Sequence, residues 1–61
     1  MPENILIIED DPLQADVVRL LLENSGFEVV LAADGAEGLR KLYEVQPDMV
    51  ILLPIRRTLR Q

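Results

Sequence analysis

Three consecutive acidic residues, Glu9, Asp10 and Asp11, follow an apolar run near the amino terminus. Carboxylate oxygens are the ligands that Mg²⁺ and Ca²⁺ prefer, and neighbouring carboxylates repel one another unless a cation, a basic side chain or solvent neutralises them. A less specific interpretation is that Asp11 caps a helix while Glu9 and Asp10 are solvated in a loop. The residue types and their spacing leave both interpretations open.

The composition limits the chemistry that the chain can perform. The 61 residues include no cysteine and no histidine, which excludes disulfides, thiolate metal sites and the commonest general base. A single small domain of this size buries only roughly 60% of its unfolded surface, so we expect association with another chain to stabilise it. The longest apolar run, Met49 to Leu53, is far shorter than a membrane span, and no signal-peptide pattern precedes it. We therefore expect a cytoplasmic protein without a membrane partner.

The charge is distributed unevenly along the chain. The net charge is −5, yet all eleven acidic residues lie before Leu53, and Arg56, Arg57 and Arg60 make the last eight residues basic. Three arginines on an acidic body are a weak electrostatic footprint for nucleic acid, so we expect no nucleic-acid partner. Residues 54–61 form a basic tail, for which a short helix and a frayed end are both plausible.

The acidic cluster lies between a predicted strand and a predicted helix. Residues 4–8 form an apolar, β-branched run that is typical of a strand buried on both faces of a parallel sheet. A helix is predicted from Pro12, with Asp11 as its N-cap and Gly26 as its left-handed end. Its apolar stripe at helical spacing consists of Leu13, Val17, Leu20 and Leu21.

The same pattern is repeated once more. Residues 27–32 predict a second strand, and Glu28 within it favours an edge position. A second helix is predicted with Asp34 as N-cap and Glu37 completing a capping box, and Pro47 ends it. Its apolar stripe consists of Ala36, Leu39, Leu42 and Tyr43. Residues 49–53 predict a third strand.

This β-α-β-α-β order predicts a three-stranded parallel sheet with right-handed crossovers. The most apolar strand belongs in the middle, which favours the spatial order 2-1-3 and places the two helices on opposite faces. Ligand sites in such sheets lie where the chain reverses direction, between the carboxyl ends of the first and third strands. The acidic cluster and Leu53 should meet there.

The segments ILIIEDDP, GFEVVLAADGAEGLRKL and PDMVIL, in this order and spacing, resemble the amino-terminal half of a response regulator receiver domain over about the first 52 residues. The resemblance implies a flavodoxin-like fold that takes a phosphoryl group from a histidine kinase onto an aspartate beside a magnesium ion. It implies that Asp10 is the direct magnesium ligand, that Glu9 is its acidic neighbour and that Asp11 is the cap. The acceptor should follow the third strand, where this chain has Leu53.

Leucine supplies neither a nucleophile nor a metal ligand, whether it marks a substitution or a deletion. We therefore expect no phosphoacceptor and no enzymatic activity, and a vestigial magnesium site at Glu9 and Asp10 whose binding is weak or absent. Two functions stay open: a phosphorylation-defective signalling module of residues 1–53 that binds a histidine kinase or regulator through its first helix, and a self-associating fragment without a signalling role. In both cases we expect a homodimer that buries an apolar surface; its predicted residues are Met49, Ile51, Leu53, Ile55 and Leu59.

Overall fold

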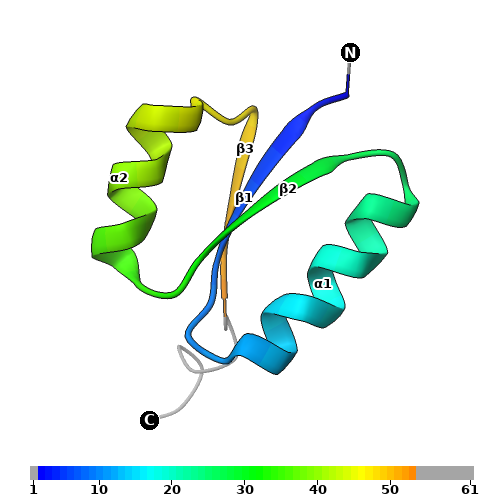
Figure 1. The fold of residues 1–61 in the computed structure, drawn as a ribbon, viewed down its shortest axis with the longest axis horizontal. Coiled ribbons are helices and arrows are strands. Elements are labelled where there is room, and N and C mark those ends of the chain that lie inside the picture. Colours follow the sequence, from blue (N-terminus) through cyan, green and yellow to red (C-terminus); the bar gives the residue numbers. More distant parts are fainter. Residues whose placement is uncertain (1, 54–61) are drawn as a thin grey trace, which may run out of the picture.

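The computed structural model describes residues 2–53 and consists of three strands and two helices in strict alternation (Figure 1). The elements in chain order are β1 (Asn4–Ile8), α1 (Pro12–Asn24), β2 (Glu28–Ala32), α2 (Gly35–Val45) and β3 (Met49–Leu52). The two later strands are each one residue shorter than the sequence predicts, because Phe27 and Leu53 lie just outside them. The predicted tail at residues 54–61 lies outside the described residues, as do the interface residues Ile55 and Leu59.

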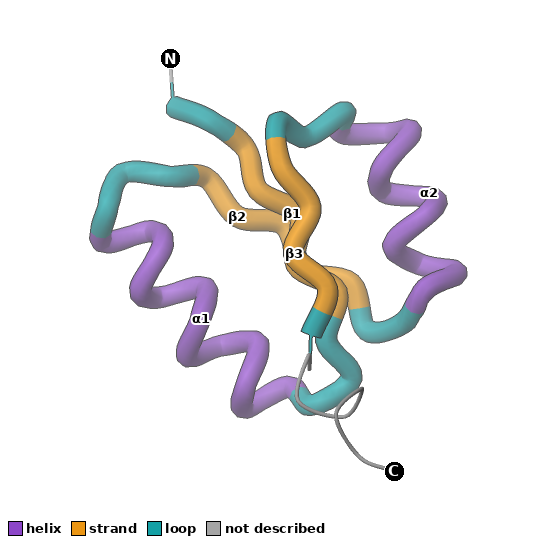
Figure 2. Tube along the Cα trace, turned by 180° about the vertical axis from the view of Figure 1, so that it is seen from behind, coloured by secondary structure: helices purple, strands orange, loops and turns teal. Residues whose placement is uncertain are grey.

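The three strands form one parallel sheet in the order β2-β1-β3, as predicted. Leu6 of β1 pairs with Val30 of β2 and with Val50 of β3, so β1 is the central strand. The helices lie on opposite sides of the sheet, and both pack over β1 and β2 (Figures 1 and 2). Among the described residues, no Cα atom of either helix lies within 8 Å of a Cα atom of β3, although Leu39 and Leu42 of α2 line an apolar groove together with Val50.

Both helices begin at the predicted aspartate caps. The Asp11 carboxylate accepts from Leu13 N at 3.1 Å, and the Asp34 carboxylate accepts from Glu37 N at 2.8 Å. These bonds satisfy backbone donors that the first turn of a helix leaves free. At the end of α1, Gly26 adopts a φ of 98°, which a residue without a Cβ tolerates readily. The two aspartates therefore define where α1 and α2 begin.

The fully buried apolar residues form a small core around the central strand, namely Ile5, Leu6, Ile7, Ala15 and Ala32. The predicted stripe of α1 is not part of this core. Leu13 is 74% exposed, and Val17, Leu20 and Leu21 are more than half exposed, because α1 turns Ala15 toward the sheet instead. All four residues of the predicted stripe of α2 are also exposed, and the buried Gly38 lies against Ile8 of β1 instead. Much of the apolar surface thus has no cover within the described residues.

Candidate functional site

The carboxyl ends of β1 and β3 bring the acidic cluster and Leu53 together. Leu53 follows β3 directly and donates its backbone N–H to Ile8 O at 2.9 Å. Ile8 is the last residue of β1, and Glu9 and Asp10 follow it at once. Two carboxylates and a leucine therefore occupy neighbouring positions at this edge of the sheet, as the parallel topology requires.

Glu9 is a buried carboxylate with one satisfied oxygen. Only 3% of the residue is exposed, and its backbone N–H donates to Ala32 O at 3.0 Å. Its Oε2 accepts from Asp11 N at 2.9 Å, while its Oε1 is buried without a hydrogen-bond partner among the described residues. An unpaired buried carboxylate oxygen is costly, so a fold retains one more readily where a cation can reach it.

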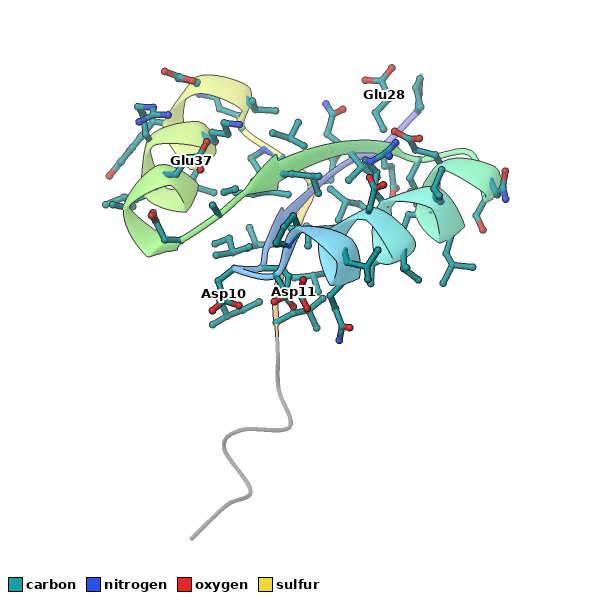
Figure 3. The ribbon with its side chains drawn as sticks, turned by 60° about the horizontal axis from the view of Figure 1, so that its bottom comes forward. Asp10, Asp11, Glu28 and Glu37 are labelled. Carbon is teal, nitrogen blue, oxygen red and sulfur yellow. The ribbon has the colours of Figure 1, made fainter. Side chains whose placement is uncertain are left out.

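Asp10 and Asp11 lie together at the same end of the molecule, and both are exposed (Figure 3). The Asp11 carboxylate caps α1 by accepting from Leu13 N, which leaves Asp10 as the exposed carboxylate of the cluster that caps no helix. Glu28 begins β2 and lies at the opposite end of the sheet in the same view. The structure therefore gives the three acidic residues three separate environments: buried, exposed and capping.

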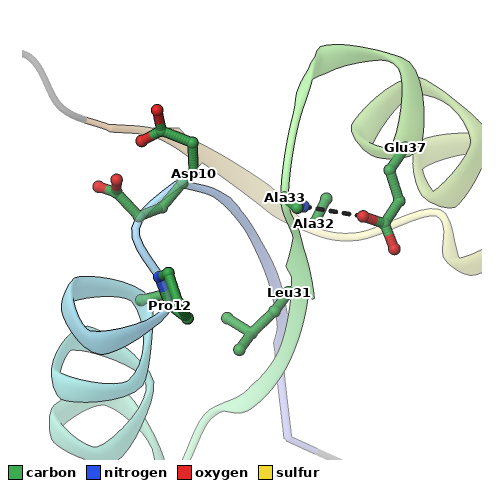
Figure 4. Close-up of a pocket in the computed structure, with 8 residues that line it drawn as sticks. Asp10, Pro12, Leu31, Ala32, Ala33 and Glu37 are labelled. Carbon is green, nitrogen blue, oxygen red and sulfur yellow. Dashed lines mark hydrogen bonds between the residues drawn. The ribbon is translucent and has the colours of Figure 1, made fainter.

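A pocket with a volume of about 370 Å³ opens beside the cluster, between the start of α1 and the start of α2 (Figure 4). Its mixed lining contains two carboxylates of the cluster and one from α2, set in a mainly apolar wall; the residues are Glu9, Asp10, Pro12, Ala15, Leu31, Ala32, Ala33 and Glu37.

Glu37, which the sequence predicts as part of the capping box of α2, also lines the pocket. Its Oε1 accepts from Ala33 N at 2.8 Å, and its Oε2 lies 3.4 Å from Lys41 Nζ. The hydrogen bond from Ala33 and the nearby Lys41 ammonium lower the pKa of Glu37 below its ordinary value. The sequence could have indicated this position of Glu37, because a capping glutamate that follows β2 must lie at the same edge of the sheet as a residue that follows β1.

The donors present fit a loosely held divalent cation better than a closed metal site. Glu9 Oε1 supplies one unpaired oxygen and Asp10 an exposed carboxylate, and Mg²⁺ commonly keeps several waters when few carboxylates hold it. Within residues 2–53, no group of three acidic side chains has the arrangement of a metal site. Leu53, which lies next to this edge, has a side chain without an oxygen that could bind a cation.

Comparison with known proteins identifies the fold's relatives. The family model described as "Response regulator receiver domain" matches residues 5–53. The chain is 35% identical over 52 residues to a DNA-binding response regulator, MtrA, of Mycolicibacterium smegmatis, a match that covers 85% of this chain and 23% of that protein. It is 44% identical over 48 residues to the DNA-binding dual master transcriptional regulator RpaA of Synechocystis, covering 79% of this chain and 20% of that protein.

A third relative is the probable C4-dicarboxylate response regulator DctR of Halalkalibacterium halodurans, to which the chain is 46% identical over 50 residues. This match covers 79% of this chain and 22% of that protein. The chain thus spans less than a quarter of the curated relatives named here. No solved structure matches it. In the described part of the chain, neither helix is long and apolar enough to span a membrane.

Proposed function

The chain belongs to the response regulator receiver family, and we propose from this premise that it is a phosphorelay signalling module that does not itself accept a phosphoryl group. The observation that carries the proposal is the position of Leu53, whose backbone is bonded to the end of β1 beside Glu9 and Asp10. Acceptance of a phosphoryl group needs a nucleophilic oxygen at the site, and a leucine side chain has none. The proposed role is therefore binding without phosphotransfer and without enzymatic activity.

The exposed apolar face of α1 is suited to binding a protein partner. Leu13, Val17, Leu20 and Leu21 form one contiguous apolar stripe on this helix, and each is at least half exposed. Asp16, Arg19 and Glu23 form ion pairs along the helix, with Arg19 Nη1 3.0 Å from Glu23 Oε1. An apolar stripe beside ordered charges suits docking of an amphipathic partner helix. We propose a histidine kinase or a regulator protein as that partner.

Magnesium binding at Glu9 and Asp10 belongs to the same proposal. The unpaired Oε1 of Glu9 would receive the ion, with Asp10 as the exposed ligand and water completing its coordination. Because Asp11 caps α1, the described residues offer two carboxylates to the ion, and we expect weak binding. The ion would neutralise a buried charge, and no reaction step depends on it.

A competition assay tests the proposed function. A histidine kinase and a complete response regulator that it phosphorylates are mixed with increasing amounts of this chain. The proposal predicts slower labelling of the complete regulator and no label on the chain. The matched variant Leu21→Glu, which places a charge on the exposed face of α1, should restore the rate. Label on the chain, or an unchanged rate at saturating chain, would overturn the proposal.

A second candidate function is self-association of the chain, because residues 2–53 leave the β3 side of the sheet largely exposed. Leu52 is 65% exposed, and Met49 and Val50 are also exposed within the described residues. An exposed apolar edge strand favours pairing with another chain. We propose a homodimer that buries Met49, Ile51 and Leu53. Sedimentation equilibrium should show dimers at micromolar concentration, and a folded monomer throughout the series would contradict this.

A further inference from the structure

We propose that Lys41 and Glu37 of α2 close the outer edge of β2 to a further strand. The two side chains bond to backbone groups of β2 that an added strand would need. This edge lies on the far side of the sheet from β3, in the order β2-β1-β3, so the inference depends neither on the proposed signalling role nor on self-association at β3.

Hydrogen bonds to the central strand show which backbone groups of β2 point outward. Ala32 O accepts from Glu9 N at 3.0 Å, so Ala32 faces β1. Because backbone groups alternate in direction along a strand, those of Leu31 and the N–H of Ala33 point away from β1. Within the described residues, β2 pairs only with β1. Its outer edge therefore presents Leu31 O and Ala33 N next to each other.

Side chains of α2 bond to both of these outward groups. Lys41 Nζ donates to Leu31 O at 2.8 Å. Glu37 Oε1 accepts from Ala33 N at 2.8 Å, the bond that Figure 4 draws as a dashed line. The two side chains lie one helical turn apart on α2, and Lys41 Nζ is 3.4 Å from Glu37 Oε2. Their exposed fractions are only 27% and 32%, so both side chains are held against the edge of the strand.

The pair matches the hydrogen-bond pattern of a residue in a parallel neighbouring strand. Such a residue donates its N–H to one carbonyl and accepts from the N–H two positions further along the facing strand. Lys41 supplies this donor to Leu31, and Glu37 supplies the acceptor to Ala33. An antiparallel neighbour that reaches Leu31 would bond to both of its backbone groups and would also need Leu31 O. A strand of either direction must therefore displace the Lys41 ammonium.

The ion pair makes this displacement unfavourable. A hydrogen bond from a charged donor is stronger than one between neutral amides, so an incoming backbone N–H is a weaker partner for Leu31 O than Lys41 is. Displacement would also remove from Glu37 the nearer of its two cations, since Arg40 Nη2 lies 3.9 Å from Oε2. Charged side chains at a strand edge are a common means by which proteins prevent edge-to-edge pairing.

The Lys41→Met substitution tests the inference, because methionine keeps an unbranched apolar stem and removes the ammonium. The matched control is Arg40→Met on the next residue, which removes the same charge from a side chain that is 62% exposed. A third variant, Lys41→Arg, keeps a cation at this position. Each variant is first shown to be folded by circular dichroism and is then compared with the native chain by sedimentation equilibrium at the same micromolar concentration.

Opening the edge should let two β2 strands pair across a two-fold axis. The weight-average mass of Lys41→Met should therefore be about twice that of the native chain, whatever the native state of association is. Arg40→Met and Lys41→Arg should keep the native mass. Equal masses for Lys41→Met and the native chain, or an equal rise in Arg40→Met, would overturn the inference. If Lys41→Met does not fold, Lys41→Ala with the control Arg40→Ala replaces it, because alanine has the highest helix propensity.

Amide hydrogen exchange identifies the edge through which the variant associates. In the native chain, the outward N–H of Leu31 has no ladder partner within the described residues, whereas that of Val30 faces β1. Pairing at β2 should slow exchange at Leu31 by at least about tenfold in Lys41→Met and leave exchange at Val30 unchanged. A rise in mass without slower exchange at Leu31 would place the contact elsewhere and overturn the inference. Either failure would leave the receiver-type signalling role and assembly at β3 untouched.

Discussion

The burial of the Glu9 carboxylate predicts that the residue lowers the stability of the fold and also helps to bind a cation. The Glu9→Gln substitution keeps an oxygen that can accept from Asp11 N, now 2.9 Å from Oε2, and removes the negative charge. The oxygen that loses its charge is buried and has no partner among the described residues. The substitution therefore separates the charge from the helix-capping contact.

The magnitude follows from the cost of an unpaired buried polar group. That cost is about 1–3 kcal/mol for a neutral group and larger for a charged one such as the Glu9 carboxylate. The glutamine amide that replaces it still leaves its own N–H groups unpaired, so only part of the cost is removed. The free energy of unfolding should thus rise by about 1 kcal/mol in the presence of a chelator. The matched control is Asp10→Asn at the exposed neighbour, which should change stability by less than about 0.5 kcal/mol.

In the presence of magnesium, the native chain should become more stable than the Glu9→Gln variant. At ten times the dissociation constant, a ligand that binds only the folded state stabilises it by about 1.4 kcal/mol, and both substitutions should remove most of that gain. The assay is equilibrium denaturation at one fixed protein concentration, followed by circular dichroism, with chelator and with a magnesium series. A Glu9→Gln variant that is less stable than the native chain in chelator would refute the reasoning, because Oε1 would then have a stabilising partner.

Three further predictions concern the elements that hold the site. Because the pKa of Glu37 is lowered in the folded state, its ionised carboxylate stabilises the fold above the ordinary pKa of 4.5, and this stabilisation disappears as the pH falls through the lowered pKa. The free energy of unfolding of the Glu37→Gln variant should therefore fall less than that of the native chain when the pH is lowered across this window. Gly38→Ala should destabilise by about 1–2 kcal/mol, because a Cβ there would lie 2.5 Å from Ile8 Cδ1. Gly35→Ala, which meets nothing within 4 Å, should be neutral or stabilise by up to about 1 kcal/mol in the same denaturation assay, and equal losses at both glycines would contradict the packing argument.

The strand order and the helix starts could be predicted from the sequence because each depends on local signals. The apolar run of β1 indicated the central strand, and Asp11 and Asp34 marked the helix caps that the structure has. Parallel topology then placed Leu53 next to the end of β1 without any knowledge of side-chain contacts.

The burial of the helices could not be predicted in the same way. A stripe such as that of Leu13 and Leu21 shows which face is apolar, but it does not show whether the described chain contains anything to cover that face. Within residues 2–53 the sheet meets Ala15 and Gly38 instead, since small residues allow close approach. Likewise, sequence spacing grouped Glu9 with Asp10 and Asp11 but gave no sign that Glu9 alone would be buried with an unpaired oxygen.

We propose that the carboxyl edge of this sheet lacks a phosphoryl acceptor. The most direct measurement is the intact mass of the chain after incubation with magnesium and a small acyl phosphate, beside a complete receiver domain treated identically. We expect a phosphoryl adduct on the complete receiver and none on this chain, because Leu53 offers no nucleophile. A stable adduct on this chain, located by fragmentation to Glu9, Asp10 or Asp11, would contradict it.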